Sequence, residues 1–247
     1  MNTHIAPKKR KKTTGNAALP ALSVVTPISL RGLAAAAPEV SGWAAKMTNV
    51  PNRPLVLASA SPARLRLLWD AGFDPVVIVS GVDETAVDDP DPAGLVETLA
   101  SRKATVAAAA SPSGSIVIGC DSMLTFDGVA LGKPETVGVA RLWWQRMRGH
   151  EAVLLTGHCV IDTATGKESA GVARTTIRFG SPSDAELDAY LMTDEPLRVA
   201  GAFTLDGFAG PFVDGIDGDH GNVIGLSLPL LRQLLANIGV AITDLWR

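Results

Sequence analysis

The segment of residues 55–66 constrains the fold and the chemistry of this chain more than any other. Its apolar start predicts a short buried strand. Ser59 and Ser61 follow, and Pro62 stands where the first turn of a helix would begin, so its missing N–H costs no hydrogen bond. Unpaired backbone N–H groups, two hydroxyls and the guanidinium of Arg64 would together suit a phosphate chain. An ordinary N-capped helix with a surface arginine explains this segment equally well.

Downstream, strand-like and helix-like patterns alternate along the chain. Strands are predicted at residues 55–58, 75–80, 115–119, 152–163 and 168–179, and helices at 63–71, 94–110, 136–148, 183–192 and 226–238. A hairpin is expected to turn at Asp127-Gly128, and residues 201–225 are expected to form glycine-rich turns. In the helix at 94–110, the residues expected to face inward are Leu95, Leu99 and Val106. This alternation predicts an α/β, or mixed α+β, domain at residues 53–247 around a mixed sheet.

The first 52 residues differ in composition from the rest. Residues 1–50 contain seven of the 22 Lys and Arg residues but only one acid, Glu39. Prolines and an alanine run accompany these charges, and this composition predicts a disordered, basic, Ala-Pro-rich extension. An alternative hypothesis is that Met47 is the true initiator and that residues 1–46 are an over-long start.

The rest of the chain carries 15 basic and 24 acidic residues, a balance that disfavours a nucleic-acid polymer as partner. No run of about 18 apolar residues occurs, so we expect no membrane association. Cys120 and Cys159 lack paired or metal-type spacing, which predicts small core residues in a reducing compartment, the cytoplasm.

Charged residues are expected to converge at the ends of several elements. Asp121 follows a predicted buried strand, and Glu84 leaves another on a turn; ligands of open α/β sheets bind beyond such strand ends. Two carboxylates could hold Mg²⁺ in the way that Mg²⁺ is held beside phosphates. Lys103, Lys133 and Arg64 could bind phosphate oxygens and stabilise the charge that develops in phosphoryl transfer.

These residues lie in short motifs whose order and spacing resemble the Maf family of nucleoside triphosphate pyrophosphatases. The motifs are Ser59-x-Ser61-Pro62-x-Arg64, Val82-Asp83-Glu84, Ala100-x-x-Lys103-Ala104, Gly119-x-Asp121-Ser122, Leu131-Gly132-Lys133-Pro134, Ala200-Gly201-Ala202-Phe203 and Gly225-Leu226-x-Leu228-Pro229. The resemblance extends from about residue 55 to residue 238. It implies the fold of the inosine-triphosphate pyrophosphatases, an elongated mixed sheet in two lobes with a central cleft.

The resemblance also implies a reaction and roles for individual residues. The reaction is hydrolysis of a nucleoside triphosphate to the monophosphate and pyrophosphate with Mg²⁺ or Mn²⁺, which would serve to clear non-standard nucleotides. Asp121 matches the family's proton acceptor and, with Glu84, a metal ligand. Lys103 and Lys133 match the motif lysines on the triphosphate, and the phosphate-binding residues would be Ser59, Ser61 and Arg64. A homodimer is a further expectation, supported by the family and by the Trp143-Trp144 pair.

Two departures from the family pattern bear on base preference. Many members that prefer uridine or thymidine nucleotides have a basic residue where this chain has Ala63, and a glutamine where it has Asp206. An ionised carboxylate only accepts hydrogen bonds, whereas a glutamine amide also donates them. The base preference therefore stays open, and an alternative is that Asp206 lies near the metal instead. The alternative functions are a nucleotide-binding regulator of septum formation without essential catalysis, and a monophosphatase or nucleotidyltransferase that uses the same residues.

Overall fold

The computed structural model describes residues 53–247, which form a mixed α/β fold around one seven-stranded sheet. The strands are β1 (Leu55–Leu57), β2 (Val76–Val77), β3 (Ile116–Phe126), β4 (Val129–Leu131), β5 (Glu151–Asp162), β6 (Glu168–Phe179) and β7 (Val213–Asp217). The α-helices are α2 (Pro62–Asp70), α3 (Pro92–Ala110), α4 (Val137–Met147), α5 (Asp184–Leu191), α6 (His220–Ile224) and α7 (Leu228–Asn237). Short 3-10 turns are η1 (Glu84–Ala86), η2 (Pro196–Arg198), η3 (Ala200–Ala202), η4 (Gly210–Phe212) and η5 (Ile242–Leu245). The predicted fold class is confirmed.

The sheet combines a parallel and an antiparallel part. Its strand order is β2-β1-β3-β5-β6-β7, with β4 paired to β3 as well. β1 runs parallel to both β2 and β3, whereas β3, β5, β6 and β7 are successively antiparallel. The hairpin from β3 to β4 turns at Asp127-Gly128, as predicted.

One edge of β3 is interrupted. β1 pairs with residues 116–118 and β4 with residues 124–126, while β5 covers the opposite edge from 116 to 125. Among the described residues no strand lies beside positions 119–123 on the β1 side, and Asp121 stands within this gap. The prediction that the strand stops before Asp121 is wrong, because pairing with β5 keeps the backbone extended through the polar residues.

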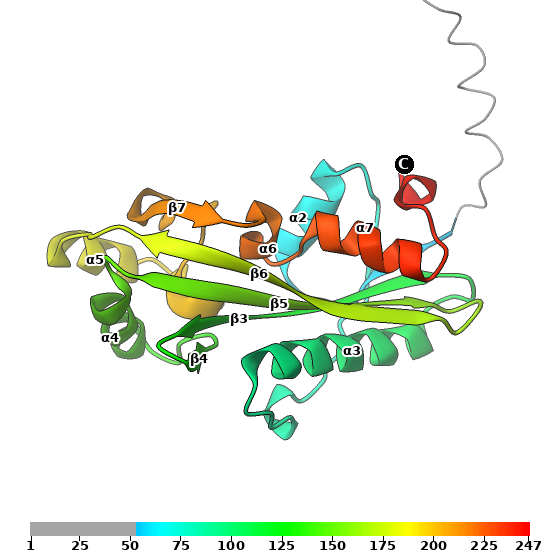
Figure 1. Ribbon diagram of the computed structural model, residues 1–247, viewed down its shortest axis with the longest axis horizontal. Helices are drawn as coiled ribbons and strands as arrows, with labels where there is room; N and C mark the ends of the chain where they lie inside the picture. The colour runs from blue at the N-terminus through cyan, green and yellow to red at the C-terminus, as the bar shows by residue number, and fades with distance from the viewer. Residues whose placement is uncertain (1–52) are drawn as a thin grey trace, which may run out of the picture. The chain divides into compact units, whose positions relative to one another are not determined.

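Helices cover both faces of the sheet. Figure 1 shows α2, α6 and α7 on one face and α3 on the other. Alternate side chains of β3 point to opposite faces, as strand geometry requires. Ile116, Ile118 and Cys120 therefore pack with α2 and α7, whereas Val117 packs with the alanines of α3.

Helix α3 lies unusually close to the sheet. Its inner face consists of Ala93, Val96, Leu99, Ala100, Lys103, Ala104 and Ala107. A Cβ at Gly157 of β5 would overlap the carbonyl of Val96 and lie 2.7 Å from the next backbone nitrogen, so only glycine permits this approach. The expectation that Val106 faces inward is wrong, since this side chain is 46% exposed: α3 begins at Pro92 and packs through its small residues.

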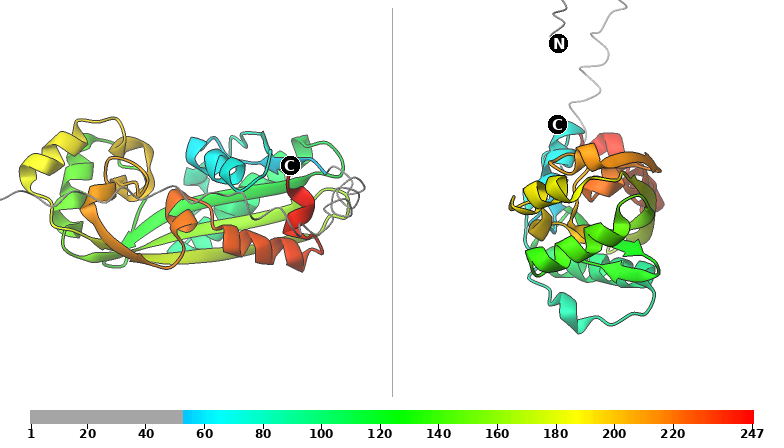
Figure 2. Two further views of the ribbon diagram at one scale, coloured as in Figure 1. Left: turned by 90° about the horizontal axis from the view of Figure 1, so that it is seen from above. Right: turned by 90° about the vertical axis from the view of Figure 1, so that its left-hand side faces the viewer.

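A second core occupies the end of the sheet where α4 and α5 lie, away from α2 and α7 (Figure 2). Trp144 of α4 is fully buried there and makes edge-to-face contacts with Phe179, Tyr190 and Phe212. Trp143 packs partly buried against the same core, as predicted for packing residues. The cores at the two ends of the sheet leave the gap in β3 between them.

Two further expectations need correction. The predicted strand at 75–80 shrinks to the two exposed residues of β2, because it pairs only with the three-residue β1 at the edge of the sheet. The predicted turns at 201–225 include strand β7, which pairs with β6, and the short helix α6. The predictions for residues 1–52, including Met47 as initiator, lie outside the described residues. No helix within residues 53–247 is both long and apolar enough to cross a membrane.

Candidate functional site

One cleft of about 770 Å³ contains every residue that the sequence predicted for the site. These residues are Ser59, Ser61, Ala63, Arg64, Glu84, Lys103, Asp121, Lys133 and Asp206. The gap in β3 opens onto this cleft through Asp121, Ser122 and Met123. Residues far apart in the sequence thus share one concave surface, as expected of a binding site.

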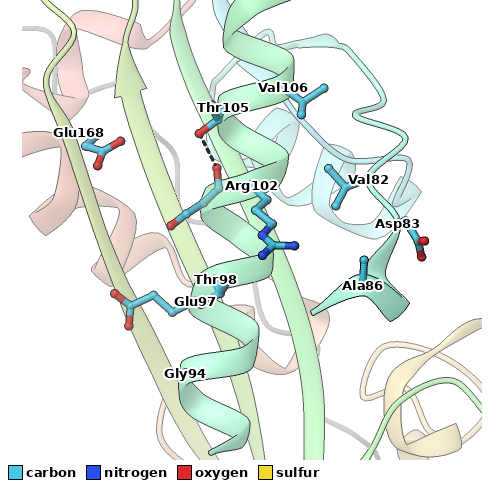
Figure 3. Close-up of a pocket in the computed structure, with 11 residues that line it drawn as sticks. Val82, Asp83, Ala86, Gly94, Glu97, Thr98, Arg102, Thr105, Val106 and Glu168 are labelled. Atoms are coloured by element: carbon cyan, nitrogen blue, oxygen red, sulfur yellow. Dashed lines mark hydrogen bonds between the residues drawn. The ribbon is translucent and has the colours of Figure 1, made fainter. Parts of the chain in front are cut away.

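A second hollow of about 750 Å³ lies on the outer side of α3 (Figure 3). None of the predicted residues lines it. Its charged lining consists of Arg102 and the three acids Asp83, Glu97 and Glu168. This mixture of a single guanidinium with an excess of carboxylates suits a phosphate chain less well than the cleft does.

Three charged side chains meet in the cleft. The ammonium Nζ of Lys103 donates to Glu84 Oε1 and to Asp121 Oδ1, both at 2.6 Å. The side chains of Lys103 and Asp121 are only 11% and 10% exposed, whereas that of Glu84 is 58% exposed. Strand alternation turns Asp121 toward α3, and a helix packed tightly on the sheet brings Lys103 within reach. The cluster therefore results directly from the close approach of α3.

The two carboxylates have the chemistry of a divalent-metal site. Their oxygens come from η1 and β3 and converge on one cationic group, the ammonium of Lys103. No group of three or more His, Cys, Asp or Glu side chains able to hold a metal occurs among residues 53–247. Two carboxylates completed by substrate phosphates are nevertheless the usual protein environment of Mg²⁺, so the donor set fits.

Arg64 lies on the other face of β3 and is buried. Its Nε donates to Gly225 O at 2.8 Å, and Nη1 donates to Cys120 O at 2.9 Å and to Ser59 Oγ at 3.0 Å. Nη2 donates to Ser122 Oγ at 2.9 Å. These four contacts use four of the five guanidinium N–H groups, so Arg64 ties α2, β3 and the turn after α6 together.

The two predicted serines shape the start of α2. Ser61 is the N-cap residue, and its Oγ accepts from the backbone N–H of Arg64 at 3.4 Å. Ser59 Oγ accepts from the backbone N–H of Ser61 at 3.2 Å and from the Arg64 guanidinium. The predicted N-cap is confirmed, but the alternative of a surface arginine is wrong, because Arg64 is buried. The start of α2 also lines the cleft.

The opposite wall carries Lys133 and Asp206, both exposed. Within the described residues no ion pair includes Lys133, so its ammonium is available to a ligand. Sequence reasoning missed Arg198 and Thr204, which also line this wall. The one available signal was that they flank the Ala200–Phe203 motif.

Buried groups behind the cleft are held neutral. Burial raises the pKa of the Cys120 thiol to about 11, which agrees with a core role. Burial lowers the pKa of His158 to about 4, so its ring is neutral at pH 7. The neutral ring can donate from Nδ1 to Thr156 O at 2.9 Å and accepts at Nε2 from the backbone N–H of Ser227 at 2.8 Å. His158 thereby fixes the start of α7 to the sheet.

Comparison with known proteins gives consistent results along the described chain. A family model described as "Maf-like protein" matches residues 54–238. A nucleoside triphosphate pyrophosphatase of Streptomyces coelicolor is 60% identical over 201 residues, which cover 81% of this chain and 98% of the relative. One from Nocardia farcinica is 52% identical over 204 residues, covering 78% and 96%.

Among solved structures, a nucleoside-triphosphatase / dITP/XTP pyrophosphatase from Mycobacterium abscessus is similar at 18% identity. The match covers 51% of this chain and 72% of that one, with a TM-score of 0.31. Such a distant likeness supports no argument about the site.

Proposed function

We propose that this chain, which belongs to the Maf family, hydrolyses nucleoside triphosphates to the monophosphate and pyrophosphate. The observation that most supports this is the convergence of nine predicted residues on one cleft. The curated relatives carry the same activity in their names, and this chain matches nearly their full length. An enzyme is therefore favoured over a nucleotide-binding regulator without catalysis.

A divalent metal is part of this proposal. Glu84 and Asp121 would hold it, because their oxygens already surround a positive charge. Mg²⁺ or Mn²⁺ bound there would supply Lewis acidity to the phosphate oxygens. The Lys103 ammonium would then bind phosphate oxygens beside the two carboxylates.

The chain's own residues would divide the work between proton transfer and charge stabilisation. Asp121 accepts the proton of the water that cleaves the anhydride bond between the α- and β-phosphates. Lys103 and Lys133 stabilise the negative charge that develops on the departing pyrophosphate. Ser59 and Ser61 offer hydroxyls at the start of α2. Arg64 contributes its remaining N–H while it holds Ser59 and the β3 backbone in place.

The base would lie toward Ala63 and Asp206, the two positions that depart from the family pattern. The carboxylate of Asp206 favours a base edge that presents an N–H donor. The small side chain of Ala63 leaves room on the opposite wall. Removal of non-standard nucleotides from the cell is the physiological role proposed for this activity.

The homodimer remains a prediction, which analytical ultracentrifugation would check by sedimentation.

The experiment is a panel of common and modified triphosphates with monophosphate, pyrophosphate and orthophosphate quantified. We expect monophosphate and pyrophosphate in equal amounts. Asp121→Asn should lower turnover by about 10²–10⁴-fold, which is the rate enhancement that a general base usually contributes. Asp127→Asn on the exposed β3–β4 turn is the matched control and should retain wild-type turnover. Release of orthophosphate alone, or full activity of Asp121→Asn, would contradict the proposal.

A further inference from the structure

The loop of residues 204–209 forms part of the cleft wall and carries Asp206 near its middle. Phe203 before it and Ala209 at its end are buried, whereas Asp206, Gly207 and Phe208 are exposed. Within the loop no helix or strand supplies a regular hydrogen-bond pattern. Some other interaction must therefore hold Asp206 against the cleft.

The loop is held by hydrogen bonds to the carboxylate of Glu195. This residue precedes the Ala200–Phe203 motif in the sequence. Its Oε1 accepts from Thr204 Oγ1 at 2.6 Å and from the Ala209 N–H at 3.4 Å. Its Oε2 accepts from the Phe208 N–H at 3.1 Å. One half-buried side chain thus holds the beginning and the end of the loop on either side of Asp206.

The loop closes tightly around this carboxylate. A Cβ at Gly207 would lie 2.8 Å from the Glu195 Cδ and nearer still to its Oε2. A side chain at position 207 would therefore have to displace the end of the Glu195 side chain from its present position. Such packing is expected if the carboxylate is a fixed centre of the loop rather than a solvent-exposed neighbour.

The segment before the loop has its own support. The carbonyl of Ala202 accepts from Trp144 Nε1 at 2.8 Å and from the Tyr190 hydroxyl at 3.1 Å. Gly201 N–H donates to Gly132 O at 2.9 Å, which links the segment to the loop that carries Lys133. The Trp144 and Gly132 contacts do not involve Glu195, so loss of its carboxylate should release residues 204–209 and leave residues 200–203 and Lys133 in place.

We infer that Glu195 is a positioning residue that sets the place of Asp206 and, through it, discrimination between nucleobases. This inference rests on the proposed function, because it assigns Asp206 to the base end of the cleft. Glu195 touches neither the reacting atoms nor the residues of the charge cluster in the contacts of the described chain. Its removal should change the binding of the base more than the chemical step.

The test compares Glu195→Ala and Glu195→Gln with the wild type on the same triphosphate panel. Glu195→Ala should raise KM about tenfold for the preferred nucleotide, leave kcat within about threefold, and reduce the kcat/KM ratio between the best and worst bases about tenfold. Glu195→Gln should be intermediate, since the amide oxygen still accepts from Thr204 while the amide nitrogen cannot accept from Phe208. Glu151→Ala, the same truncation on an exposed strand residue, should match the wild type.

A second measurement separates this inference from the proposed function. Peptide-resolved hydrogen exchange on the free protein should show faster exchange over residues 204–210 in Glu195→Ala, with α3 and β5 unchanged. If Glu195→Ala fails to fold, Glu195→Gln carries both measurements. An equal fall in kcat/KM for all bases, or unchanged exchange in the loop, would overturn the inference. If the wild type hydrolyses no triphosphate, the proposed function fails and the exchange data alone decide the positioning role.

Discussion

His158 should make this protein sensitive to mild acid. The folded state holds the ring neutral with a pKa of about 4, mainly because burial disfavours the charged form, against 6.5 for an exposed histidine. Protonation therefore favours the unfolded chain. The stability that depends on a neutral ring is fully present above pH 6.5 and is lost as the pH falls toward 4.

The size of this loss of stability follows from proton linkage, with a His158 pKa of 6.5 in the unfolded chain and about 4 in the folded protein. The loss of unfolding free energy is about 0.2 kcal/mol at pH 7, about 2 kcal/mol at pH 5 and about 3 kcal/mol at pH 4. A loss of this size is a large fraction of the total stability of an ordinary domain.

Urea unfolding of the wild type and of His158→Gln at several pH values between 7.5 and 4 measures this loss. The variant should be less stable at pH 7, since it loses a well-packed ring that bridges Thr156 and Ser227, but its stability should decline less on acidification. The difference between the two proteins should therefore narrow by about 3 kcal/mol over the range. His150→Gln, at an exposed histidine, is the control and should keep the wild-type slope. Parallel curves for the wild type and His158→Gln would refute the reasoning.

Three further substitutions test the packing around the cleft. Gly157→Ala should destabilise the fold by about 1–3 kcal/mol in urea unfolding and lower turnover, because the added methyl pushes Val96 and the rest of α3 off the sheet; wild-type stability would contradict this. Arg64→Lys should cost about 3 kcal/mol in the same assay, since an ammonium cannot reproduce the four hydrogen bonds of the guanidinium, and a loss under about 0.5 kcal/mol would contradict the role of Arg64 in holding α2, β3 and the turn after α6 together. Ser227→Ala should cost about 1 kcal/mol through the lost cap of α7, yet keep the acid sensitivity of the wild type, because its backbone N–H still reaches His158.

Local sequence signals predicted the elements that depend on local chemistry. The helix that starts after Ser183 has the capping box expected from Glu186 three residues later. The β5–β6 hairpin follows from the two long strands predicted on either side of the Thr165-Gly166 turn. The strand β3 could not be delimited in this way, because its length is set by pairing with β5 rather than by its own polar residues.

In the candidate site, too, local motifs could be predicted from the sequence whereas long-range contacts could not. The order of the motifs predicted that Glu84, Lys103 and Asp121 belong to one site, and in the structure they are in contact. The environment of Arg64 was not predictable, since two of its acceptors lie 56 and 161 residues away in the sequence. Glu195 was missed for a related reason: three of its hydrogen bonds are made with a loop that has no periodic pattern.

The interrupted edge of β3 also affects how the protein behaves in concentrated solution. An open sheet edge is a template on which strands of other molecules can add, and long exposed edges lead to aggregation. Here the open part is limited to residues 119–123 and is closed at both ends by β1 and β4. The Cys120 carbonyl within it is already bonded to Arg64. The open backbone of residues 119–123 can thus remain accessible to a small ligand. The flanking strands β1 and β4 make this open edge too short for a strand of another molecule to pair with it.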